Sequence, residues 1–217
     1  MARLRNGASG TGGPEAPEPV PSPGTWAIDR SSTVGFVARQ FLVHRVRGRF
    51  GSFRATVEMG TQVVGASITG EVDTGSVVTG DPARDEHLRS AEFFDAERWP
   101  TMRLVGRIAR TAPHGYVADT ELTIRDVTRP VAFDVRFRHP AAGGGAVRGG
   151  ASEGSEGGGA SEAGGDDDGP TVAAVALATV SRKDFGLCWN ATIETGGVIV
   201  ADQVDLVLDL VARRLPT

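Results

Sequence analysis

The residues best suited to chemistry form a polar run, Arg84, Asp85, His87 and Arg89, shortly after Asp81-Pro82. Aspartate as an N-cap with proline at the first helical position predicts a short helix here. Arg84 and His87 then share one face of that helix, and an arginine fork suits a phosphate. Two readings stay open. Arg84, His87 or Arg89 meets the polar head of a ligand, or Asp85 caps backbone amides while the arginines pair with acids; we favour the second.

A second polar run contains Arg182, Lys183 and Asp184. These side chains either contact a ligand head group or form a salt bridge that closes the fold, and we again favour the structural role. The four histidines are scattered without metal-ligand spacing, so no metal site is predicted. No catalytic residue is predicted either, since the single cysteine, Cys188, has no placed base beside it.

The bulk composition suits one domain in a chain of 217 residues, of which 40% are hydrophobic. A formal charge of −4 argues weakly against nucleic acid or an anionic membrane as a partner. The N-terminus lacks the apolar run of a secretory signal, and no stretch of about 18 apolar residues could form a membrane-spanning helix. We therefore expect a cytoplasmic location, no resident cofactor and no integral membrane segment.

Two segments have the composition of disordered chain. Residues 1–24 contain five prolines and almost no large apolar side chain, which predicts a disordered tail. Residues 141–170 form an insert rich in glycine and acidic residues, whose composition predicts a flexible, self-repelling loop between two strands. The predicted domain is therefore 25–215, interrupted by this insert.

The rest of the chain alternates apolar and polar residues with a period of two, the pattern of half-buried strands. Val131, Phe133, Val135 and Phe137 alternate with polar or small residues, and similar alternation occurs within 34–39, 53–59, 101–108 and 204–211. Further strands are expected at 66–73, 115–124 and 171–181. About eight strands and one short helical segment, with a second helical turn at 91–95, predict an all-β fold, an antiparallel barrel or sandwich.

A barrel of eight strands is just wide enough to be filled by side chains or to hold one small ligand. Several positions expected to face inward are small: Gly35 or Ala38, Gly70, Gly106, Ala174, Ala176 and Ala178. Small side chains leave apolar volume, which an apolar ligand could fill. Alternatively, they make room for bulky neighbours such as Phe36, Phe133 or Trp99, and the periodicity leaves both readings open.

Four ordered motifs carry a family resemblance. They are Thr25-Trp26-Ala27-Ile28-Asp29 with Val34-Gly35-Phe36, the segment Arg84 to Asp95 with Trp99-Pro100, the hairpin Leu122 to Val131, and Ser181 to Leu187. Together they resemble the YceI-like family of polyisoprenoid-binding, lipocalin-like barrels. The resemblance implies a closed eight-stranded antiparallel barrel whose pore takes an isoprenoid quinone, a polyprenyl phosphate or a similar lipid. The sequence departs from the family pattern at Ser31-Ser32, at Asp126 and in the insert.

The leading hypothesis is thus a protein that binds and sequesters or carries a long apolar lipid without catalysis. The alternatives are an enzyme that orients an isoprenoid or polyene substrate, and an adaptor that uses the acidic insert; a homodimer stays open. The head-group candidates are Arg84, His87, Arg89 and Arg182. The candidates for contact with the lipid chain are Phe36, Phe53, Val57, Leu104, Phe133, Phe137, Leu206, Leu208, Trp99 and Phe94, although aromatic residues after the helix are more often a plug.

Overall fold

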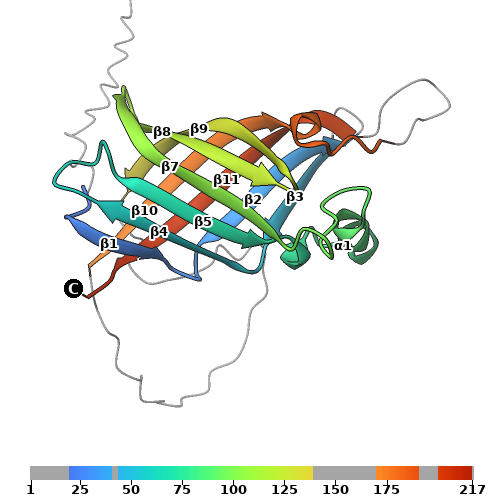
Figure 1. Ribbon diagram of the computed structural model, residues 1–217, viewed down its shortest axis with the longest axis horizontal. Helices are drawn as coiled ribbons and strands as arrows, with labels where there is room; N and C mark the ends of the chain where they lie inside the picture. Colours follow the sequence, from blue (N-terminus) through green and yellow to red (C-terminus); the bar gives the residue numbers. More distant parts are fainter. Residues whose placement is uncertain (1–19, 41–43, 139–169, 191–199, 217) are drawn as a thin grey trace, which may run out of the picture.

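The computed structural model describes residues 20–40, 44–138, 170–190 and 200–216. These residues form eleven strands, one α-helix and two short 3₁₀ turns (Figure 1). The strands are β1 (Gly24–Ile28), β2 (Thr33–Gln40), β3 (His44–Phe50), β4 (Phe53–Met59), β5 (Ser67–Asp73), β6 (Val77–Val78), β7 (Thr101–Ala112), β8 (Gly115–Ile124), β9 (Val127–Arg138), β10 (Thr171–Ser181) and β11 (Val200–Arg214). The helix is α1 (Pro82–Arg89), and the 3₁₀ turns are η1 (Thr74–Ser76) and η2 (Arg182–Phe185).

Eight strands close the barrel in the order β1-β4-β5-β7-β8-β9-β10-β11, and β11 pairs back onto β1. All of these pairings are antiparallel. The long strand β11 pairs with β1 near its C-terminal end and with β2 nearer its start, and β3 continues the sheet beyond β2. The prediction of a closed eight-stranded antiparallel barrel with a single short helix is confirmed.

The alternation in the sequence correctly predicts which side chains face the interior. On β9, Val131, Phe133 and Val135 are buried, whereas Ala132 and Asp134 between them are exposed. This alternation arises because successive side chains of a strand point to opposite faces of the sheet. The strands predicted at 66–73, 115–124 and 171–181 correspond to β5, β8 and β10.

One end of the barrel, here called the floor, is closed by large apolar side chains. Trp26 is only 2% exposed, and its indole Nε1 donates to the carbonyl of Ser22 at 2.9 Å. Met59, Val63 and Ile108 are buried with it in the same apolar cluster. The floor therefore excludes water at the end where β11 finishes.

The opposite end, here called the mouth, carries α1 and η2 (Figure 1). Asp81 caps α1, since its carboxylate accepts from the backbone amides of Ala83 and Arg84, and Pro82 occupies the first helical position as predicted. The expected second helical turn at 91–95 is wrong: this segment forms turns and contains Asp95 at a φ of 52°. A left-handed residue interrupts a right-handed helix.

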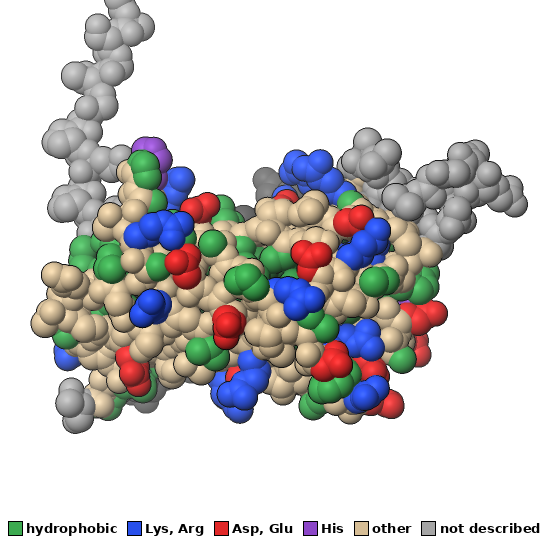
Figure 2. Space-filling model, turned by 45° about the horizontal axis from the view of Figure 1, so that its top comes forward, with side chains coloured by type: hydrophobic (Ala, Val, Ile, Leu, Met, Phe, Trp, Pro, Cys, Tyr) green, Lys and Arg blue, Asp and Glu red, His purple; other side chains and the backbone are tan. Residues whose placement is uncertain are grey.

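Residues 1–19 of the predicted tail and 141–169 of the predicted insert lie outside the described residues, so disorder there remains a prediction. Within 20–24, Pro21 is buried and β1 begins at Gly24, so this end of the predicted tail belongs to the barrel. Over the face drawn in Figure 2, basic and acidic side chains are interspersed with apolar ones. Among the described residues, no helix combines the length and hydropathy needed to cross a membrane.

Candidate ligand-binding cavity

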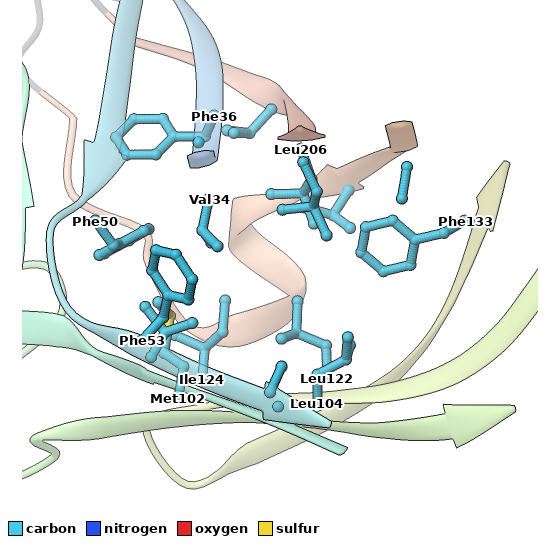
Figure 3. A pocket seen from close by; sticks show the side chains of 18 of the residues that line it. Val34, Phe36, Phe50, Phe53, Met102, Leu104, Leu122, Ile124, Phe133 and Leu206 are labelled. Carbon is cyan, nitrogen blue, oxygen red and sulfur yellow. The ribbon is translucent and has the colours of Figure 1, made fainter. Parts of the chain in front are cut away.

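A cavity of about 650 Å³ occupies the barrel interior. Side chains from opposite walls converge on it, with Val34 and Leu206 on one side and Leu104 and Leu122 on the other (Figure 3). Its lining is predominantly apolar and runs from Trp26 and Met59 at the floor to α1 at the mouth. The interior is therefore shaped to hold a hydrocarbon.

Nine of the ten predicted chain-contact residues line this cavity: Phe36, Phe53, Val57, Leu104, Phe133, Phe137, Leu206, Leu208 and Phe94. The exception is Trp99, whose ring lies 5.1 Å from the guanidinium carbon of Arg98. The carbonyl of Trp99 accepts from Thr74 Oγ1 at 2.8 Å, which ties the segment before β7 to η1. Trp99 therefore belongs to the packing around the barrel end rather than to the cavity wall.

Most of the predicted small inward residues also line the cavity, namely Gly35, Ala38, Gly70, Ala174 and Ala176. Gly106 and Ala178 do not. A Cβ on Gly106 would stand 2.4 Å from the carbonyl oxygen of Asp119 and 2.6 Å from Thr120 Cα, so glycine there permits close approach of β8. Ala118, which is not among the predicted inward residues, lines the wall instead.

Other wall residues were missed although the same alternation could have revealed them. Leu122 and Ile124 follow Thr120 at period two on β8, and all three line the cavity. Glu71 on β5 forms ion pairs with Arg54 of β4 and Arg103 of β7, and the exposed side chains of both arginines place this group on the outer face of the barrel. This charged trio was not anticipated, because cross-strand neighbours depend on register.

The buried polar side chains of the wall are satisfied within the protein. Thr120 is 6% exposed, and its hydroxyl donates to the carbonyl of Val131 at 2.8 Å. A buried polar group that already has its partner makes no demand on a ligand. The wall can therefore bind a long chain through apolar contacts, and it leaves few hydrogen-bonding groups for a ligand.

At the mouth, three rings from two separate segments meet. His87 of α1 packs edge-on against Phe93 at 5.1 Å and against Trp189 at 4.4 Å, measured between ring centroids. Phe93 and Trp189 are themselves 5.4 Å apart. All three line the cavity, so α1 and the segment after η2 jointly cover its end. Trp189 was missed, since only tertiary structure brings it to α1.

Three of the four predicted head-group residues line the cavity, namely Arg84 and His87 of α1 and Arg182 of η2. The His87 ring nitrogen Nε2 contacts the carboxylate of Glu92. Arg84 donates from Nε to Thr79 Oγ1 at 2.8 Å, while Asp85 accepts from the amide of the same Thr79. Asp85 thus holds a backbone amide, as favoured from the sequence.

Arg89 does not line the cavity, which corrects its assignment as a head-group candidate. Its Nε donates to the carbonyl of Gly75 at 2.7 Å, and its Nη2 donates to the carbonyl of Val77 at 2.9 Å. Arg89 therefore fastens α1 to η1 and β6. Its partners are backbone carbonyls rather than the acids expected from the sequence.

Arg182 lines the cavity but has no donor left for a ligand. It is 5% exposed and donates to the carbonyls of Leu187, Trp189, Val200 and Ala201, with the carboxylate of Asp202 at 3.5 Å. These contacts use all five N–H groups of a guanidinium. Burial lowers the pKa of Arg182, and the charge of Asp202 opposes that shift. The ion pair of Arg182 is therefore with Asp202 and not with a residue of its own run, 182–184.

No cluster of three or more histidine, cysteine or acidic side chains able to hold a metal ion occurs in the described part of the chain. The closed barrel, its apolar interior and α1 at the mouth define a lipocalin-like barrel with an internal cavity. A family model described as the YceI-like domain matches residues 26–212, and the chain belongs to this family.

Curated relatives and solved structures are similar to this chain in sequence and in fold, respectively. UPF0312 proteins of Staphylococcus aureus strains MSSA476 and MW2 are 26% identical over 178 residues, covering 80% of this chain and 87% of theirs. Burkholderia cenocepacia BcnA superposes with a TM-score of 0.63 at 21% identity, covering 85% of this chain and 98% of that one. A polyisoprenoid binding domain from Saccharophagus degradans has a TM-score of 0.56 at 13% identity, covering 88% and 98%. These structural likenesses support the fold.

Proposed function

We propose that this protein binds a long apolar lipid in its barrel and sequesters or carries it. The observation that carries the proposal is the apolar cavity of about 650 Å³, lined by residues from around the closed barrel. At about 24 cal/mol per Å³, an apolar cavity of that size without an occupant would forgo on the order of 15 kcal/mol of packing. This loss is comparable with the whole net stability of a typical domain. Filling the cavity with an apolar ligand would therefore stabilise the folded protein.

We propose an isoprenoid, such as an isoprenoid quinone or polyprenyl phosphate, as the ligand class. Support comes from family membership and from the name of the Saccharophagus degradans domain, which describes polyisoprenoid binding by that protein. Each buried CH₂ contributes about 0.8 kcal/mol, so a few isoprene units supply ample affinity without directed bonds. Arg84 and His87 are the remaining head-group candidates, because both reach the mouth.

Native mass spectrometry of the purified chain, followed by lipid extraction, tests the proposal. We expect an apolar molecule to co-purify, or added polyprenyl lipid to be taken up at one molecule per chain. Absence of both would contradict lipid binding. Uptake of fatty acids with rejection of polyprenyl lipids would retain a lipid carrier and refute the isoprenoid.

Binding without turnover stays a prediction. The test is incubation of the loaded protein with an isoprenoid or polyene substrate, followed by product analysis. Turnover that is lost in a folded Asp85→Asn or His87→Gln variant would favour an enzyme over a carrier. Since Asp85 accepts from the Thr79 amide, each variant needs a thermal melt to show that it is folded.

A further inference from the structure

The outer face of the β2–β3 ladder carries four exposed arginines, Arg39, Arg45, Arg47 and Arg49, here called the arginine face. Arg45, Arg47 and Arg49 alternate along β3, which places them on one side of the sheet. Arg39 on β2 stands directly opposite Arg45. Like charges directly opposite each other destabilise an antiparallel pair, so this arrangement costs the isolated barrel some stability.

None of these four arginines forms an ion pair within the described residues. Elsewhere on the barrel, exposed arginines meet carboxylates across the strands, as Arg110 does with Asp119 and Arg138 with Asp209. Exposed Arg107 and Arg136, on β7 and β9, also have no ion pair among the described residues. The β2–β3 ladder is therefore distinguished by four such arginines that lie together on neighbouring strands. The formal charge of −4 hides this local excess.

The arginine face adjoins the mouth of the cavity. Arg39 and Val46 line the cavity itself, together with Arg84 of α1. A shallow hollow beside it is lined by Arg45, Arg47 and again Val46 and Arg84. In Figure 1, β2 and β3 run toward the end of the barrel that carries α1. The unbalanced charge therefore stands where a ligand would enter.

We propose that the arginine face docks the barrel on an anionic lipid bilayer, with the mouth toward the membrane. The charge complementarity favours a surface of anionic head groups, and exposed Val78, paired with Arg49 at the edge of the ladder, adds an apolar contact. A bilayer is also where a long apolar lipid resides, a point that rests on the proposed function. Each basic residue near an anionic surface adds its own contribution to the free energy of binding, and salt weakens that contribution by screening.

The experiment compares vesicles of equal parts phosphatidylglycerol and phosphatidylcholine with vesicles of phosphatidylcholine alone, using co-sedimentation of the full chain. We expect binding to the anionic vesicles only, weakening as salt is raised. The variant R45Q/R47Q/R49Q is expected to bind on the order of a hundredfold more weakly, at about fivefold for each arginine. If this variant fails a thermal-melt check, the three single substitutions replace it, each with the fivefold expectation.

The matched control is R30Q/R107Q/R136Q, which removes the same charge from exposed arginines away from the arginine face. Its vesicle binding should equal that of the wild type. Equal binding by the two triple variants, or wild-type binding to both vesicle types alike, would overturn the proposal. So would binding of a single-stranded RNA probe by a chain that ignores the anionic vesicles.

Lipid content is measured in the same preparations, which separates the two proposals. Vesicle docking by a chain that neither co-purifies with nor takes up an apolar lipid supports the arginine face and contradicts the carrier function. Lipid uptake by a chain that does not dock on vesicles supports the carrier function and contradicts the proposal for the arginine face.

Discussion

The ring of Phe36 lies over Gly48 across the β2–β3 ladder, and a Cβ atom on Gly48 would stand 2.2 Å from Phe36 Cζ. Phe36 lines the cavity and packs against Phe50, with ring centroids 5.9 Å apart. The glycine therefore creates the room in which an aromatic wall residue lies flat against its neighbouring strand. Position 48 determines the shape of this part of the cavity although it contributes no side chain.

Gly48→Ala should lower the free energy of unfolding by about 1–3 kcal/mol, because the added methyl forces Phe36 out of place. Urea unfolding measures the effect. Gly60→Ala is the control, since no atom lies within 4 Å of a Cβ placed there, and it should change stability by less than about 0.5 kcal/mol. In a Phe36→Ala background the cost of Gly48→Ala should fall, since the clash is gone; strict additivity would disprove the relationship.

Ala176→Phe should reduce lipid uptake at least about tenfold, because a phenyl ring at this wall position occupies space that the ligand needs. Ala176 is 5% exposed and lines the cavity, whereas its neighbour Leu177 is 46% exposed on the outer face. Leu177→Phe on the same strand is therefore the matched control and should bind normally. A fluorescent apolar probe measures both variants, and equal uptake by the two would count against a ligand in the barrel.

Arg182→Lys should destabilise the protein by about 2–4 kcal/mol, since an ammonium offers three donors where the guanidinium uses five. The lost hydrogen bonds join the segment ending at Trp189 to the start of β11. Lys183→Gln, which removes only an exposed partner of Asp202, should cost no more than about 1 kcal/mol. Chemical denaturation of both variants measures the difference, and equal costs would refute the role of Arg182.

Asp29 makes a pH-dependent contribution to the stability of the folded protein. The hydrogen bonds from Ser31, first among them that from its backbone amide at 2.8 Å, hold the pKa of this carboxyl below its ordinary value, with help from Arg213. A lowered folded-state pKa means that the carboxylate stabilises the protein above its unfolded pKa of about 3.9 and that this contribution vanishes as pH falls through the folded value.

Asp29→Ala should therefore cost about 0.5–1 kcal/mol at pH 7, in line with a partly exposed group. The difference from the wild type should shrink as the solution is acidified below about pH 4. Urea unfolding at a series of pH values measures it, and an NMR titration of the Asp29 carboxyl provides the folded pKa directly. A difference that grows on acidification would contradict the assignment.

Much of the cavity wall could be predicted from local alternation alone. Phe133 and Phe137 of β9, and Leu206 and Leu208 of β11, line the cavity as expected, because each strand buries one of its two faces. Trp99 was misplaced because it lies outside any alternating segment, where no periodicity indicates direction. Gly106 was misread because its smallness serves a close strand approach rather than empty volume.

The mouth could not be predicted in the same way. The meeting of His87 with Trp189, and the five acceptors around Arg182, join segments far apart in the chain. Sequence spacing informs only on neighbours within an element, such as positions three or four apart on a helix. Arg182 has a structural role, as favoured from the sequence, but the sequence could not predict which carbonyls and which carboxylate it contacts.

The sequence by itself determined most of the strands and their inward faces, the start of α1 and the apolar character of the interior, because these follow from short-range periodicity and capping. It did not predict β3 or β6. Only the tertiary structure decided that the ring closes through β11 onto β1 and that the small residues line a cavity rather than pack against bulky neighbours. It also decided that Arg182 has no donor left while the arginines of β2–β3 stay unbalanced. Those features depend on register and closure, which bring together residues that no local pattern relates.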